Sequence, residues 1–218
     1  MNNKALYKFS YGLFVLTAED KKNGRANGCI INTAIQLTSD PLKISIAVNK
    51  ANYTHDLIME NKKFNISMIS EDATFDLFKR FGFQSGKTEN KFSGFSGYKN
   101  AVNDIPYITD GCNAYVSAWV TDTVDLGTHT LFIATVTDME VLSDTPSATY
   151  TYYQSHIKED LKPAGKTADG KTVWRCVICG YEYIGDVLPD DFICPICKHP
   201  ASDFEKVNYN KYCSLLFL

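Results

Sequence analysis

Four of the seven cysteines form two Cys-x-x-Cys pairs, Cys176 with Cys179 and Cys194 with Cys197, and fourteen residues separate the pairs. Four thiolates at this spacing can surround one metal ion as a tetrahedral sulfur site, which takes either zinc or iron. Zinc would make the segment a structural or binding module, whereas iron would make it a carrier of single electrons. The residues around the cysteines therefore bear on the chemistry.

These surroundings favour iron. Gly180 follows the first pair, so the backbone can fold closely over a sulfur atom and direct N–H groups toward it. Aromatic side chains flank the pairs and would exclude water, which is one way in which a protein sets a redox potential; they are Trp174, Tyr181, Tyr183 and Phe192. A zinc ribbon remains the alternative interpretation.

Residues 174–183 and 188–197, followed by Ala201, Phe204 and Glu205, resemble rubredoxin. The loop between the pairs is shorter than in free-standing rubredoxins, as in rubredoxin modules that are fused to other proteins. The resemblance implies one iron ion, cycling between Fe3+ and Fe2+, with Cys176, Cys179, Cys194 and Cys197 as its ligands. His156 and His199 are not needed beside a complete set of four cysteines.

The remaining cysteines, Cys29, Cys112 and Cys213, show no pairing pattern, which is typical of a protein kept in a reducing compartment. The first residues form no apolar signal segment, and no apolar run reaches the length of a membrane span. We therefore expect a soluble cytoplasmic protein. A net charge of −3 and a pI near 5.8 argue against nucleic acid as a partner, because phosphate binding favours a basic face.

The composition predicts two domains. Residues 1–156 are enough for one core, and residues 173–207 carry the cysteine pairs. Residues 157–172 between them are rich in Lys, Gly and Thr and predict a flexible linker, which would span roughly 20–25 Å as a coil. Residues 208–218 form an apolar C-terminal tail with no assigned role.

The first domain is predicted to be mainly β. Apolar and polar residues alternate with a period of two along 42–48, 114–120 and 131–136, and further strands are expected at 12–18, 27–36 and 64–70. Short helices are expected near 53–62, opened by Asn52 or Thr54, and near 72–82, ending at Gly82. Many strands with few helices favour a closed or sandwiched antiparallel barrel. No G-x-G-x-x-G motif supports a Rossmann site.

A one-electron carrier needs a neighbour that supplies electrons, and flavin is the usual converter between hydride donors and single electrons. Residues 5–155 carry, in order, the motifs of the flavin-reductase-like FMN-binding split barrel, which the domain resembles. These motifs are 27–33, 38–41, 49–56, 81–87 with Lys91 and Phe92, 125–133 and 149–153. The resemblance implies a split β-barrel that binds FMN at the interface of a homodimer.

The resemblance and the chemistry of the side chains together predict the FMN contacts. Amide and backbone groups of one strand would meet the polar edge of the flavin ring, and a helix start with a hydroxyl and a lysine would hold the phosphate. A loop after the second helix is expected to reach the cofactor, across a subunit boundary in one arrangement. The predicted contacts are Asn27, Gly28, Cys29, Asn32, Thr33, Ser39, Asn49, Lys50, Asn52, Thr54, Ser85 and Lys87.

Each group also has a purely structural interpretation: polar residues of an edge strand, a plain helix cap with a solvated lysine, and a cysteine that only packs. His129, in a Gly-x-His motif, is the predicted catalytic residue and would orient the nicotinamide of NAD(P)H against the flavin. A histidine satisfied within its strand is the alternative. His55 is expected to be structural or to lie beside the phosphate.

The two domains together resemble the high-molecular-weight rubredoxins of anaerobes. The resemblance implies an NAD(P)H-dependent oxidoreductase that passes electrons through FMN to the iron centre and on to a partner such as a flavodiiron oxygen or nitric oxide reductase. Three alternatives stay open: a reductase of diffusible flavin with an accessory metal module, a zinc-ribbon binding or regulatory protein, and a flavoprotein whose electron donor is another protein.

Overall fold

The structure is a computed structural model that describes residues 8–158, 172–178 and 180–206. The chain divides into two compact units, Met1–Lys158 and Glu159–Leu218. Most of the predicted linker (159–171), the tail 208–218, Cys179 and Cys213 lie outside the described residues. Ile157, which the sequence assigned to the linker, is buried in the core of the first unit at the end of a π-helical turn, η2 (Tyr153–Ile157).

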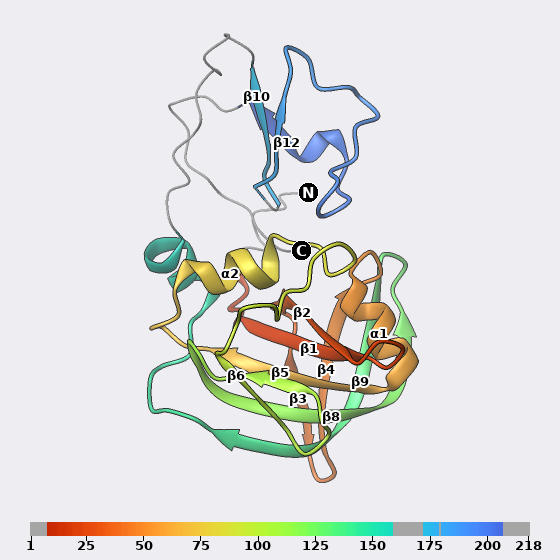
Figure 1. The fold of residues 1–218 in the computed structure, drawn as a ribbon, viewed down its shortest axis with the longest axis vertical. Coiled ribbons are helices and arrows are strands. Elements are labelled where there is room, and N and C mark those ends of the chain that lie inside the picture. The colour runs from red at the N-terminus through yellow and green to blue at the C-terminus, as the bar shows by residue number, and fades with distance from the viewer. Residues whose placement is uncertain (1–7, 159–171, 179, 207–218) are drawn as a thin grey trace. The chain divides into compact units, whose positions relative to one another are not determined.

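The first unit is built around one antiparallel sheet of seven strands, in the order β2-β1-β5-β8-β9-β4-β3 (Figure 1). The mainly β fold expected from the sequence is confirmed. The strands of the sheet are β1 (Phe14–Asp20), β2 (Arg25–Ile31), β3 (Ile35–Ser39), β4 (Leu42–Asn49), β5 (Lys63–Ile69), β8 (Cys112–Asp125) and β9 (His129–Val141); β6 (Tyr98–Asn100) and β7 (Pro106–Ile108) form a separate hairpin.

The sheet curls around an apolar core. Inward-facing residues of β4 (Ile44, Ile46, Val48) pack in the same cluster as Leu16 of β1, although these strands lie near opposite ends of the strand order. A sheet whose distant strands share one core is strongly curved, as a barrel requires. The helix α1 (Tyr53–Asn61) packs on this core through buried Leu57 and Ile58.

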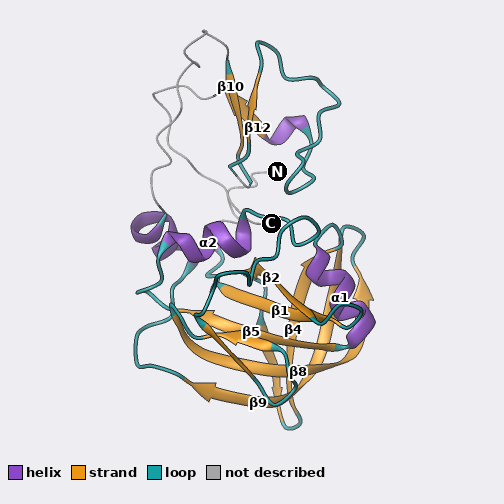
Figure 2. Cartoon of the chain, viewed as in Figure 1, coloured by secondary structure: helices purple, strands orange, loops and turns teal. Residues whose placement is uncertain are grey.

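A second cluster forms where α2 (Phe75–Gly82) packs against the other side of β1 and β2 (Figure 2). Its apolar stripe, including Phe78 and Phe81, is buried, as the sequence pattern predicts. The ring of Tyr153 lies 4.3 Å from that of Phe78. The short helix α3 (Tyr150–Tyr152) and η2 therefore fasten the end of the unit to α2.

The structure corrects one predicted strand. Residues 27–36 do not form a single strand, because β2 ends at Ile31 and β3 begins at Ile35 on the opposite edge of the sheet. Thr33 in the connection donates its hydroxyl to the carbonyl of Ala47 on β4 (2.8 Å) and accepts from the Ala47 N–H (3.1 Å). These two hydrogen bonds take the place of ladder bonds where the chain crosses from β2, at one edge of the sheet, to β3, at the other edge.

The second unit is a small three-stranded antiparallel sheet, in the order β11-β10-β12, with a short 3-10 turn. Its elements are β10 (Val173–Cys176), β11 (Glu182–Ile184), η3 (Ala201–Asp203) and β12 (Phe204–Lys206). Its core consists of Cys176, Leu188, Cys194 and Phe204. With so few apolar residues, the unit depends on further cross-links, which its cysteines provide when they bind a metal.

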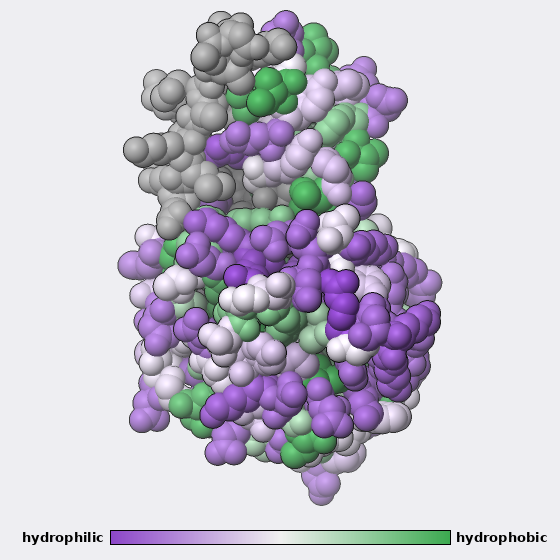
Figure 3. All heavy atoms as spheres, in the orientation of Figure 1, coloured by the Kyte–Doolittle hydropathy of each residue, from purple (hydrophilic) through white to green (hydrophobic). Residues whose placement is uncertain are grey.

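On the face of the first unit seen in Figure 3, hydrophilic residues predominate and apolar residues are scattered. In the described part of the chain, every helix is too short or too polar to span a membrane.

Candidate functional site

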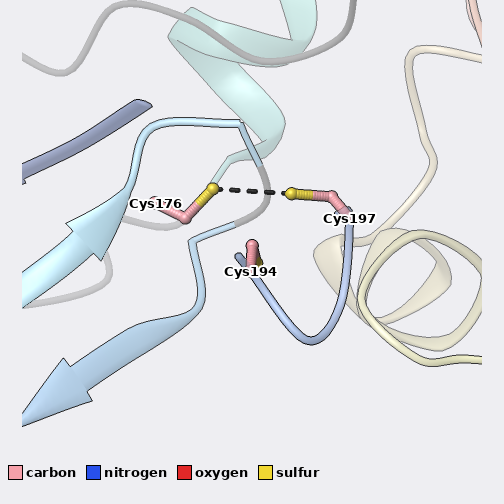
Figure 4. A group of neighbouring side chains, drawn as sticks. All are labelled: Cys176, Cys194 and Cys197. Carbon is pink, nitrogen blue, oxygen red and sulfur yellow. Dashed lines mark hydrogen bonds between the residues drawn. The ribbon is translucent and has the colours of Figure 1, made fainter. Parts of the chain in front are cut away.

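Three of the four predicted metal ligands converge in the second unit (Figure 4). The sulfur atoms of Cys176, Cys194 and Cys197 all lie within 4.8 Å of one another, and those of Cys176 and Cys197 are 3.5 Å apart. A tetrahedral ion with metal–sulfur bonds near 2.3 Å places its sulfur atoms about 3.8 Å apart. The described thiol groups therefore fit a tetrahedral iron or zinc ion. Cys179, the fourth predicted ligand, lies outside the described residues.

The two Cys-x-x-Cys segments have matching backbone turns. The N–H of Gly180 donates to the carbonyl of Cys176 (2.9 Å), and the N–H of Lys198 donates to that of Cys194 (3.0 Å). Both residues after the pairs have left-handed backbone angles, with φ of 78° at Gly180 and 64° at Lys198. The sequence pointed to Gly180, but it gave no signal for Lys198, because a lysine seldom adopts this conformation.

An aromatic shell surrounds the cysteines, as predicted. Tyr181, Tyr183 and Phe192 pack with Phe204 in the core that holds Cys176 and Cys194, both of which are fully buried, and Trp174 packs against the same core. Cys197 is the least buried of the three described ligands. The Nδ1 atom of His199 lies 3.1 Å from the carbonyl of Cys197, so this histidine contacts the backbone of the site.

In the first unit, predicted cofactor residues gather at the start of α1. Asn52 caps the helix, because its side chain accepts a hydrogen bond from the Thr54 N–H (3.1 Å). Asn27 of β2 donates to the hydroxyl of Thr54 (2.9 Å), and both residues are buried. The buried thiol of Cys29 is held by the same groups: burial raises its pKa, whereas the charge of Lys91 and hydrogen bonds with Thr54 and Asn52 act in the opposite direction.

A hairpin places His129 next to the end of β4. His129 pairs with Asn49 in the β4–β9 ladder, and the N–H of Lys50 donates to the carbonyl of Thr128 (3.0 Å). The hydroxyl of Thr128 lies 2.9 Å from Nδ1 of His129. The ammonium of Lys50 binds Asp125 (2.7 Å) and lowers the pKa of that carboxyl group, so this predicted phosphate ligand forms an ion pair in the structure.

The loop after α2 reaches the same place. Gly86 lies so close to Asn27 that a β-carbon on this glycine would be 2.0 Å from the side-chain oxygen of Asn27. Only glycine fits there while Asn27 keeps its bond to Thr54. The ammonium of the neighbouring Lys87 lies 3.7 Å from a carboxylate oxygen of Asp56, in the first turn of α1. The structure thus brings residues 85–87 to β2 and α1 within one chain.

Asn32 and Thr33 lie near this group, whereas Ser39 does not. Thr33 contacts Ala47, two residues or about 7 Å before Asn49 on β4. Ser39 is exposed and pairs with Leu42, seven residues or about 23 Å before Asn49. Within one chain, therefore, Ser39 does not belong to the group at the start of α1.

Lys91 also lies at this place; it is not among the predicted contacts, although the motif with Phe92 includes it. Its buried ammonium donates to the carbonyls of Gly28 on β2 (2.8 Å) and Phe81 at the end of α2 (3.0 Å). Burial lowers the pKa of Lys91 to about 8, and the nearby Cys29 opposes that shift. A buried lysine at this place joins the loop after α2 to the strand that carries Asn27, Gly28 and Cys29.

Comparisons with known proteins agree with both parts of this picture. The flavin reductase like domain family matches residues 6–159, and the rubrerythrin, rubredoxin-like domain family matches residues 174–205. The high molecular weight rubredoxin of Moorella thermoacetica is 37% identical over 233 residues, which cover 95% of this chain and all of that protein. The chain belongs to the family of high-molecular-weight rubredoxins. It is an oxidoreductase in which a flavin reductase-like domain precedes a rubredoxin-like domain.

One further relative and one solved structure add to this comparison. The ferric-chelate reductase (NAD(P)H) of Archaeoglobus fulgidus is 38% identical over 174 residues, which cover 80% of this chain and 98% of that protein. An FMN-binding protein from Thermus thermophilus shares the fold, with a TM-score of 0.56 at 19% identity over 62% of this chain and 73% of that one. At 19% identity, the similarity to the Thermus thermophilus protein shows a common fold and nothing more.

Replacing Lys91 with Met is expected to change how the free energy of unfolding depends on pH. Because the folded-state pKa is about 8 and the ordinary value is 10.5, the unfolded chain binds more protons between these pH values. Stability due to Lys91 therefore rises with pH across this window, by about 3 kcal/mol relative to the Met variant. Urea unfolding of both proteins from about pH 7 to about pH 10.5 measures the difference. Lys99→Met, at an exposed lysine, is the control, and parallel curves for wild type and Lys91→Met would contradict the assignment.

Proposed function

We propose that the chain transfers electrons from NAD(P)H through FMN, bound in the barrel, to an iron ion held by Cys176, Cys179, Cys194 and Cys197. The observation that supports this most is that one chain combines three cysteines whose sulfur atoms converge within an aromatic shell with a flavin reductase-like domain. Residues 1–156 would form the flavin domain and residues 173–207 the iron domain. The reduced iron would then serve a partner protein.

The residues around α1 suit FMN. Amides of Asn27 and Asn32 would bind the polar edge of the ring, and the start of α1, with Asn49, Asn52 and Thr54, would bind phosphate oxygens. The other predicted contacts in this group are Gly28, Cys29, Thr33, Lys50, Ser85 and Lys87. When bound, FMN accepts hydride and releases electrons singly, which matches a two-electron donor to a one-electron metal centre.

NAD(P)H is proposed as the donor because the ferric-chelate reductase that the barrel resembles is named for it. His129 would hydrogen bond to the nicotinamide and hold it against the flavin, since hydride transfer depends mainly on alignment. Thr128, 2.9 Å from Nδ1, would fix the orientation of the imidazole ring.

Electrons would leave the iron near Cys197. This ligand is partly exposed, and the exposed apolar residues Ile193 and Ile196 stand beside the second cysteine pair. A protein partner could displace water at such a surface and approach the metal closely. A flavodiiron oxygen or nitric oxide reductase is the proposed acceptor.

A homodimer is proposed because the edge strand β3 is exposed and presents two apolar side chains. The edge strand β3 is exposed along its whole length, including Ile35 (62%) and Leu37 (46%). An exposed edge strand that carries apolar side chains is normally covered, and a second copy of the chain would cover it and bring its Ser39 near a flavin.

Ile35→Glu is expected to shift the protein from dimer to monomer and to weaken FMN binding, because it places a charge in the proposed interface. Sedimentation equilibrium and flavin fluorescence measure the two effects. Val102→Glu is the matched control, because Val102 is even more exposed and lies outside the sheet. A wild-type protein that is monomeric at micromolar concentration and binds FMN would refute the homodimer.

Anaerobic absorption spectra before and after one equivalent of NADPH or NADH test the electron path. Both the ferric thiolate bands and the flavin bands are expected to bleach. Flavin bleaching without an iron band would point to zinc and to a reductase or binding protein. Flavin that separates from the protein on gel filtration would favour a diffusible-flavin reductase. If both bands are present and neither bleaches, the donor is another protein.

Cys194→Ser is expected to abolish or strongly perturb electron delivery to an external acceptor while FMN stays bound, because Cys194 is a buried ligand in the second unit. Flavin content, iron content and acceptor reduction are measured on the same sample. Cys112→Ser, at a buried cysteine of the first unit, is the control that should keep the iron bands. Equal loss of flavin and iron in Cys194→Ser would contradict two separate sites.

A further inference from the structure

A cavity of about 260 Å3 lies beside the proposed flavin residues, and the predicted contacts account for only two of its lining residues, Asn27 and Lys87. It lies between the β1–β2 hairpin, the start of α1 and the loop after α2. Its volume is below the usual range for a drug-sized ligand, so it suits one group of a larger molecule. The lining residues are Asp20, Asn23, Arg25, Ala26, Asn27, Tyr53, Gly86, Lys87 and Glu89.

Arg25 is the main feature of this cavity. It is exposed at the first position of β2, and among the described residues its guanidinium group has no ion-pair partner. Lys87 supplies a second positive charge to the wall of the cavity. Its ammonium also forms an ion pair with the carboxylate of Asp56, at a distance of 3.7 Å. Tyr53, also in the wall, is the first residue of α1, where the partial positive charge of a helix favours anions.

The two carboxylates of the wall differ in availability. Asp20 is buried and already accepts hydrogen bonds from the hydroxyl of Tyr53 (2.6 Å), the side chain of Asn23 (2.7 Å) and the N–H of Lys22 (3.0 Å). Its charge is therefore compensated by donors. Glu89 is exposed and, within the described ranges, has no hydrogen-bonded side-chain partner. The carboxylate of Glu89 can turn to solvent, but in its position at the wall it repels an anion in the cavity.

We propose that this cavity binds a phosphate monoester, with the Arg25 guanidinium as the principal ligand and Glu89 as a charge that weakens the binding. A phosphate monoester carries close to two negative charges at neutral pH, and the planar guanidinium can donate two parallel hydrogen bonds to it. This inference rests on the proposed function, because that function names the molecules that bring a phosphate monoester to the protein. Two molecules of that function carry one: FMN, at its ribityl end, and NADPH, at its adenosine ribose.

The test compares ligands that differ only in this group. Isothermal titration calorimetry of the flavin-free full-length protein gives the affinities for FMN and riboflavin, and the FMN-loaded protein is titrated with NADP+ and NAD+. Neither measurement requires electron transfer, so a failure of NAD(P)H to reduce the protein would refute the proposed donor without affecting this comparison. The variants are Arg25→Ala, Glu89→Gln and, as a control for net charge, Lys99→Ala on β6.

Arg25→Ala is expected to lower the affinity for either FMN or NADP+ at least about tenfold. The matching ligand without the phosphate, riboflavin or NAD+, should bind as before. Glu89→Gln should raise the same affinity, and Lys99→Ala should change neither. An effect confined to FMN identifies the flavin phosphate as the occupant, and one confined to NADP+ identifies the dinucleotide and predicts a preference for NADPH. The proposal would be overturned if Arg25→Ala lowered the affinities for FMN and riboflavin equally and those for NADP+ and NAD+ equally. It would also be overturned if none of these affinities changed.

Discussion

The first unit depends on how the edge strand β2 is covered. An edge strand has unpaired backbone groups, and here a buried ammonium binds one of them: Lys91 donates to the carbonyl of Gly28 and also to that of Phe81. Phe81 packs closely on Gly28, and Gly86 closely on Asn27. The loop after α2 is therefore fixed to β2 at two adjacent residues. These contacts fix the strand that carries Asn27, which in turn donates a hydrogen bond to Thr54 at the start of α1.

This arrangement explains why a buried lysine is tolerated. Burial disfavours its charged form and lowers its pKa to about 8, which is a cost at neutral pH. Two carbonyl acceptors offset part of that cost, and replacing the lysine would leave them without a donor. The same charge lies near Cys29, in the strand proposed to contact the flavin. A single side chain thus links the stability of the loop to the electrostatics of the proposed site.

The sequence predicted the elements better than the way in which the chain connects them. Period-two patterns located β4, β8 and β9, and Asn52 was one of the two residues expected to open α1. The break between β2 and β3 was missed because Thr33 is compatible with a strand, and only its bonds to Ala47 show the crossing. Lys198 was missed because its left-handed backbone follows from the metal site rather than from its own preference. Ser39 lies far from the other predicted contacts because of the register in which β3 pairs with β4, and one sequence does not reveal that register.

The chain also shows how one residue type is used in two opposite ways. In the first unit, burial raises the pKa values of Cys29 and Cys112, so these cysteines stay as neutral thiols and pack as small apolar groups. In the second unit, two fully buried cysteines and a partly buried one converge within 4.8 Å. Thiolates this close repel one another and are stable only when a metal ion compensates their charge. Metal binding is therefore directed to the second unit by geometry, and the scattered cysteines of the barrel do not compete for the ion.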